Sequence, residues 1–195
     1  MNKRALILPV SAFLFSLVAL ALAALWTFAP SPEATRASAV GGPFELTAMD
    51  GKRVRSTAFE GAPTLVFFGF TNCPDICPTK LMELSQMFRE AGPKAAKVRA
   101  LFITVDPARD TPEVLKNYLA SFDARIIGLT GSQDEIDATV KAYRAYYKKV
   151  PTSNGDYTMD HTAVIYLMDK RGQFVGAFNI ERAPADAARD LLRYL

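Results

Sequence analysis

The residues best suited to chemistry in this 195-residue chain are its two cysteines, Cys73 and Cys77, and its single histidine, His161. Thiolate sulfur and imidazole nitrogen bind soft transition metals, and a thiolate also attacks disulfides. With so few of these residues, a four-cysteine zinc site and a scaffold built on many disulfides are both excluded. Any site made from thiolate and imidazole must therefore use these three residues.

The two cysteines lie in the segment Cys-Pro-Asp-Ile-Cys-Pro. Cys-x-x-Cys redox pairs have one fewer intervening residue, so this wider loop can accommodate a metal ion between the sulfurs. A disulfide remains feasible if the two Cβ atoms approach to about 4 Å. Cys77 comes directly before a predicted helix. Because the free N–H groups at a helix start stabilise an anion, we expect the pKa of the Cys77 thiol to be lowered.

Strands and helices alternate in the part of the chain that must position these residues. Short apolar runs at residues 64–70 and 98–105 predict buried strands, and a helical pattern follows each of them. A Ser132-x-x-Glu135 capping box predicts a further helix. The alternation predicts an α/β fold with parallel strands and helices on both faces. The two cysteines then follow the carboxyl end of a buried strand, where open α/β sheets hold their sites.

Hairpins flank this alternating part. An Asp50-Gly51 turn between apolar runs predicts an N-terminal β-hairpin, and two short apolar strands followed by a helix end the chain. Residues 150–160 are polar and predict a loop. The order of elements resembles the thioredoxin fold with an N-terminal β-hairpin extension. That analogy concerns the fold and carries no function by itself.

His161 stands at the predicted start of the C-terminal hairpin, which in thioredoxin-like folds lies against the active-site loop. The imidazole should therefore face the two sulfurs. Two thiolates and one imidazole suit Cu(I) and also Cu(II), whereas zinc prefers a fourth ligand. Asp160 is not expected to be that ligand, because neighbouring strand residues point to opposite faces. Two alternatives stay open: a purely structural disulfide between the cysteines, and a purely structural histidine.

The N-terminus carries a long apolar segment. Residues 5–29 contain no charge, and a membrane-spanning helix needs about 20 residues. We expect residues 1–29 to form an uncleaved anchor rather than a cleaved signal peptide, and residues 30–42 to form a linker. Two basic residues precede the segment, so the N-terminus should stay in the cytoplasm. Residues 43–195 should then form a periplasmic domain attached to a bacterial inner membrane.

The charge balance is nearly even, with 23 Lys and Arg against 20 Asp and Glu, and no basic block stands out. Nucleic acid is therefore not an expected partner. A hydrophobic content of 50% with 22% charged residues excludes a disordered chain.

From about residue 43 onward the chain resembles the Sco/SenC family of membrane-anchored copper chaperones. Three motifs carry the resemblance: FTNCPDICP at 70–78, VDPARDTP at 105–112, and Asp160-His161-Thr162 with YLMD at 166–169. The resemblance implies a thioredoxin-like fold with copper bound by Cys73, Cys77 and His161. It also implies assembly of the binuclear CuA site of cytochrome c oxidase, in subunit II, with copper received from a periplasmic donor.

A second class of function fits the same cysteines. In a thiol–disulfide oxidoreductase, one of Cys73 and Cys77 attacks a disulfide of a partner protein and the other resolves the mixed disulfide. The resemblance also covers family members that act as thiol reductases or redox sensors. His161 distinguishes the two functions, because a copper chaperone needs it as a ligand and an oxidoreductase needs only the cysteines. A peroxidase is not expected, since its Thr-x-x-Cys spacing is missing.

Overall fold

The computed structural model describes residues 16–20, 40–153 and 155–195. The chain divides into two units, Met1–Ala39 and Val40–Leu195. In the first unit, residues 16–20 are helical. No helix of the described residues combines the length and the apolar character that crossing a bilayer requires. The predicted anchor at 1–29 and linker at 30–42 fall almost entirely outside the described residues. The division of the chain into an anchor (1–29), a linker (30–42) and a domain (43–195) therefore stays a prediction.

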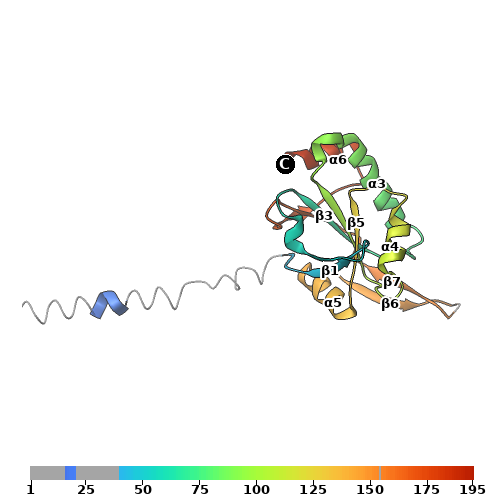
Figure 1. The fold of residues 1–195 in the computed structure, drawn as a ribbon, viewed down its shortest axis with the longest axis horizontal. Helices are drawn as coiled ribbons and strands as arrows, with labels where there is room; N and C mark the ends of the chain where they lie inside the picture. Colours follow the sequence, from blue (N-terminus) through green and yellow to red (C-terminus); the bar gives the residue numbers. More distant parts are fainter. Residues whose placement is uncertain (1–15, 21–39, 154) are drawn as a thin grey trace, which may run out of the picture. The chain divides into compact units, whose positions relative to one another are not determined.

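A mixed β-sheet forms the centre of the second unit (Figure 1), and in the described part it has seven strands in the order β2-β1-β5-β4-β3-β8-β9. The three central strands run parallel: β3 (Thr64–Gly69), β4 (Arg99–Thr104) and β5 (Ile126–Thr130). The outer strands pair antiparallel: β1 (Glu45–Ala48), β2 (Arg53–Arg55), β8 (Ile165–Met168) and β9 (Phe174–Ala177). The sheet confirms the predicted α/β class and the N-terminal hairpin.

The central strands are buried because their sequences are apolar on both faces. Every residue of β3 is buried, and so are five of the six residues of β4. Phe67 and Phe102 lie opposite each other in the two strands, with their ring centroids 5.9 Å apart. A strand that is covered on both sides holds its carboxyl end in a fixed position, which is where the cysteine loop begins.

Four α-helices lie around the sheet: α3 (Ile76–Ala91), α4 (Pro112–Leu119), α5 (Gln133–Ala142) and α6 (Pro184–Leu191). Helix α3 packs beside α6, and α4 packs against β5 (Figure 1). Three short 3₁₀ helices complete the unit: η1 (Ser56–Phe59), η2 (Gly92–Ala95) and η3 (Leu192–Tyr194). Thr111 caps the start of α4, and its hydroxyl accepts a hydrogen bond from the Val114 N–H.

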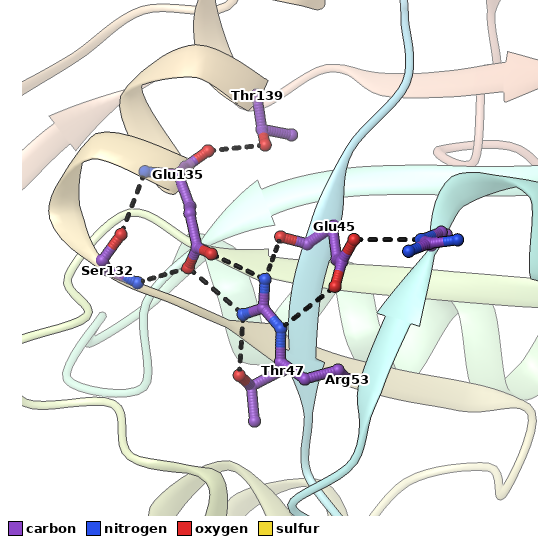
Figure 2. Close-up of polar contacts among 7 residues, drawn as sticks. Glu45, Thr47, Arg53, Ser132, Glu135 and Thr139 are labelled. Carbon is purple, nitrogen blue, oxygen red and sulfur yellow. Dashed lines mark hydrogen bonds and ion pairs between the residues drawn. The ribbon is translucent and has the colours of Figure 1, made fainter.

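The start of α5 is bound to the N-terminal hairpin (Figure 2). Ser132 and Glu135 form the predicted capping box, in which each side chain accepts the other residue's backbone N–H. The Glu135 carboxylate also pairs with Arg53 of β2 at 2.6 Å. Arg53 donates further hydrogen bonds to the Glu45 carbonyl and the Thr47 hydroxyl. These contacts attach the hairpin extension to the helix that follows β5.

A second, two-stranded sheet stands where the sequence predicted a loop. Strand β6 (Tyr147–Pro151) pairs antiparallel with β7 (Tyr157–His161), so the prediction of a loop over the whole of residues 150–160 is wrong at the residues that these strands include. These strands carry charged, exposed residues such as Lys148 and Asp160, and they lack the apolar alternation that marks a half-buried strand. His161 consequently ends strand β7 instead of starting the C-terminal hairpin. Its partner in the register is Tyr147.

Candidate metal centre

The cysteine loop connects the carboxyl end of β3 to helix α3. The helix begins at Ile76, so Cys77 lies inside its first turn and not directly before it, as the sequence had suggested. Cys73 is half-buried and Cys77 is completely buried. The Cys77 N–H donates a hydrogen bond to the Cys73 sulfur at 3.4 Å. One N–H group of the helix start therefore faces the sulfur of Cys73 and not that of Cys77, the residue for which the sequence predicted this stabilisation.

The absence of a side chain at Gly69 makes room for the buried sulfur. A Cβ atom at this position would lie 2.9 Å from the Cys77 sulfur and 2.5 Å from Cε2 of Phe102. Both separations are shorter than an ordinary van der Waals contact of about 3.5–4.0 Å. The last residue of β3 therefore has to be glycine for Cys77 and Phe102 to pack as they do.

His161 approaches the sulfurs from strand β7. Its Nε2 lies 3.6 Å from the Cys77 sulfur, and its Nδ1 lies 3.1 Å from the Thr162 carbonyl oxygen. A carbonyl oxygen only accepts hydrogen bonds, so this contact places the ring proton on Nδ1 and leaves the Nε2 lone pair for the sulfur side. The ring also packs against Phe67 and Phe70, with centroid separations of 6.3 and 5.7 Å.

The three residues form a single cluster, as the sequence analysis expected. Their ligand atoms all lie within 4.8 Å of one another, and both cysteines are free thiols. Among the described residues no other cysteine, histidine or acidic side chain belongs to the cluster. Cys77 and His161 are 84 residues apart in the sequence, so only the folded chain brings them together.

Burial sets the protonation of both Cys77 and His161. Removal from water raises the pKa of the Cys77 thiol above its ordinary value, and the neighbouring Cys73 raises it further. The expectation of a lowered pKa for Cys77 was therefore wrong, because desolvation outweighs the helix terminus. Burial lowers the pKa of His161 below its ordinary value of 6.5, against smaller opposing effects of the Thr162 carbonyl and Asp160. The imidazole is consequently neutral at neutral pH, which is the form that binds metal.

The donor set fits copper. Metal–sulfur and metal–nitrogen bonds of about 2.0–2.3 Å place ligands around one ion roughly 3.5–4 Å apart. The observed distance of 3.6 Å between Nε2 and the Cys77 sulfur falls in this range. The Cys73 sulfur lies within 4.8 Å of both atoms, so it needs to move by only about 1 Å to bind the same ion. Two sulfurs and one imidazole suit copper in both common valences, whereas structural zinc takes four ligands.

In the sequence, the motif at residues 105–112 carries only the family resemblance, and the structure gives two of its residues contacts with the elements that hold the cluster. Asp110 is fully buried and accepts hydrogen bonds from Thr71, two residues before Cys73. Arg109 contacts Tyr157, at the other end of the strand that carries His161. Two acidic residues in the segment between the apolar strand β4 and the next helix were the available signal, since buried carboxylates need hydrogen-bond partners.

Comparison with known proteins gives relatives over most of the chain. The family model described as SCO1/SenC matches residues 32–195. The mitochondrial protein SCO2 of Saccharomyces cerevisiae is 44% identical over 142 residues, which are 71% of this chain and 47% of that protein. The chain thus spans about half the length of this curated relative.

Two solved structures show the same fold. The copper-bound structure of ScoI from Bradyrhizobium japonicum is 57% identical with a TM-score of 0.78, and the match covers 80% of this chain and 100% of that one. BsSco, described as a member of the Sco family of cytochrome c oxidase assembly proteins with a disulfide switch, is 28% identical with a TM-score of 0.62. That match covers 80% of this chain and 94% of BsSco. The thioredoxin-like expectation is confirmed at the level of the fold.

The location predicted from the sequence is wrong. No helix of the described residues can span a membrane, and the matched yeast protein is a mitochondrial one. The prediction of a bacterial inner membrane with a periplasmic domain is therefore withdrawn. Basic residues before an apolar segment indicate the orientation of a segment and do not identify the membrane.

Proposed function

The chain belongs to the SCO1/SenC family, and from this premise we propose that it is a copper chaperone which holds its cargo with Cys73, Cys77 and His161. The observation that carries the proposal is the meeting of two sulfurs and one imidazole nitrogen within 4.8 Å. The neutral imidazole with its proton on Nδ1 supports the same role, because Nε2 is then ready to bind a metal.

We propose further that the copper is received from a donor protein and delivered to the CuA site in subunit II of cytochrome c oxidase. The description of BsSco as an oxidase assembly protein supports this acceptor. The unequal exposure of the two thiols supports transfer by ligand exchange. An acceptor thiolate would form its bond to copper on the side of the half-buried Cys73 as the bond to Cys73 breaks, with no change in the valence of copper. Cys77, which is completely buried, would release the metal last.

Anaerobic loading of the reduced protein with copper tests the binding site. We expect one copper per chain, with sulfur and nitrogen in its coordination shell by X-ray absorption. The variant Cys73→Ser/Cys77→Ser should bind none, and His161→Ala should bind far more weakly. Thr158→Ala, on the same strand as His161 but outside the cluster, is the matched control and should bind as the wild type does. Full copper affinity in His161→Ala would remove the histidine from the site.

Delivery is tested with a copper-free CuA domain of subunit II from the same organism. Loaded wild-type protein should pass copper to this domain, with the absorption spectrum of the binuclear centre as the readout. Retention of copper by the loaded protein over the same time would contradict the proposed acceptor while leaving the binding site intact.

A second candidate function is thiol–disulfide exchange with a partner protein. It is supported by the two free thiols lying close enough to form a disulfide after a small movement, and by the disulfide switch described for BsSco. His161→Ala separates the two functions, since it should abolish tight copper binding and leave oxidation of the dithiol in place. A wild-type protein that retains no copper but cycles readily between dithiol and disulfide would favour the oxidoreductase.

A further inference from the structure

The carboxylate of Asp110 holds the start of the cysteine loop. It is completely buried, and it accepts hydrogen bonds from the Thr71 N–H at 3.0 Å and the Thr71 hydroxyl at 2.5 Å. It also accepts a hydrogen bond from the hydroxyl of Thr104, the last residue of β4, at 2.5 Å. Thr71 precedes Cys73 by two residues. Three hydrogen bonds to one buried carboxylate therefore fix the backbone from which the first cysteine projects.

The neighbouring residue, Arg109, holds the start of the strand that carries His161. Its guanidinium lies 3.3 Å from the centroid of the Tyr157 ring, and its Nη1 donates a hydrogen bond to the Tyr157 carbonyl at 2.9 Å. Arg109 also pairs with Asp156. Tyr157 begins β7 and His161 ends it, so the position of this arginine sets the position of the strand.

We propose that Arg109 and Asp110 are positioning residues for the metal centre, one for each half of it. Asp110 acts through Thr71 on the cysteine loop, and Arg109 acts through Tyr157 on the histidine strand. Arg109 and Asp110 are adjacent in the chain. A shift of the cysteine loop relative to the histidine strand therefore has to break the contacts of one of these two residues. The inference rests on the proposed function, since it assigns these residues to the site that holds copper. Neither residue belongs to the cluster of ligand atoms.

The chain offers a matched control for a merely structural role. Arg125 pairs with Asp123 at 2.7 Å and lies over the Phe88 ring at 4.5 Å, which repeats the arrangement of Arg109 with Asp156 and Tyr157. The Arg125 side chain is 20% exposed and that of Arg109 is 24% exposed. Arg125 directly precedes β5, at the edge of the sheet opposite to the metal centre.

The experiment compares Arg109→Gln and Asp110→Asn with the controls Arg125→Gln and Asp123→Asn. Copper(I) affinity of the reduced protein is measured by competition with a chromophoric chelator, alongside thermal unfolding of the metal-free protein. We expect the first two variants to lose roughly 10–100-fold in affinity, the range typical of residues that orient metal ligands. The controls should lose comparable thermal stability and keep wild-type affinity. Should Asp110→Asn fail to fold, Thr71→Val removes one of the same hydrogen bonds and should weaken copper binding in the same direction.

A second readout needs no copper. His161 is the single histidine, so its ring signals in an NMR spectrum are unambiguous, and the adjacent rings of Phe67 and Phe70 make their shifts sensitive to displacement. In the metal-free protein Arg109→Gln should move these signals, and Arg125→Gln should leave them in place. Unchanged signals together with control-like copper affinity would overturn the inference. Failure of the wild type to bind copper would instead refute the proposed function, and the histidine signals would then decide the positioning role alone.

Discussion

Replacing Gly69 by alanine tests how tightly the buried thiol is packed. The new Cβ would lie 2.5 Å from a ring carbon of Phe102 and 2.9 Å from the Cys77 sulfur. The first distance is shorter than a normal contact by about 1 Å, and the second by about 0.6 Å. Phe102 is held between Phe67 and Tyr118, whose ring centroids lie 5.9 and 6.0 Å away, so it has little freedom to retreat. Overpacking of this kind costs about 1–3 kcal/mol of unfolding free energy. For a protein of this size each kcal/mol lowers the Tm by about 2–4 °C.

The same substitution should weaken copper binding. To relieve the overlap the Cys77 sulfur has to move, and this changes its 3.6 Å separation from Nε2 of His161. We expect a loss of roughly 10–100-fold in copper(I) affinity, as for other changes that displace a metal ligand without removing it. Chelator competition of the reduced protein measures this effect separately from stability.

Gly176→Ala is the matched control for this substitution. Gly176 also lies in a strand, and a Cβ there would meet nothing within 4 Å. Alanine should therefore leave copper affinity unchanged and raise the unfolding free energy by up to about 1 kcal/mol, because it reduces the freedom of the unfolded chain. Denaturant unfolding of both metal-free variants gives the comparison. If Gly69→Ala proves as stable as Gly176→Ala and binds copper as the wild type does, the packing argument is refuted.

Three further predictions concern two buried groups and one exposed helix cap. The Cys77 thiol keeps its proton in the folded protein at a pH where the unfolded chain loses it, because burial raises its pKa. The unfolding free energy of the reduced, metal-free protein should therefore fall as pH rises through the ordinary value of 9.0, by at most about 1.4 kcal/mol per pH unit, and Cys77→Ala should remove this component. The buried Tyr118 hydroxyl has no hydrogen-bond partner among the described residues, so Tyr118→Phe should raise the unfolding free energy by about 1 kcal/mol in chemical denaturation, and a loss would show that the hydroxyl is satisfied. Ser132→Ala removes the hydroxyl that accepts the Glu135 N–H in the capping box of α5. It should lower the unfolding free energy by about 1 kcal/mol in the same assay, with unchanged copper affinity.

The parts of the fold that could be predicted are those in which local sequence and tertiary structure agree. The apolar run at 64–70 has no alternative to a buried strand, and it became β3. The Ser132 capping box depends on contacts within one turn, and it formed as predicted. The meeting of Cys73, Cys77 and His161 could be predicted because the chain contains only these three residues from which a site of thiolate and imidazole can be built.

Features that depend on distant packing could not be predicted in the same way. Strands β6 and β7 pair mainly with each other and carry exposed charges, so no apolar pattern marks them. The direction of the pKa shift at Cys77 depends on how completely Gly69 and Phe102 allow the sulfur to be buried. The contact of Asp110 with Thr71 joins residues 39 positions apart and is visible only in the folded chain.

The separation of 84 residues between Cys77 and His161 has a consequence during synthesis of the protein. Chains are made from the N-terminus at about 5–20 residues per second, so Cys77 precedes His161 by roughly 4–17 s. During that interval the two thiols exist without the imidazole and without the β6–β7 sheet that carries it. The newly made dithiol is therefore open to oxidation before the three-ligand site exists. The chain accordingly needs a reducing environment during synthesis if both thiols are to be free to bind copper once it has folded.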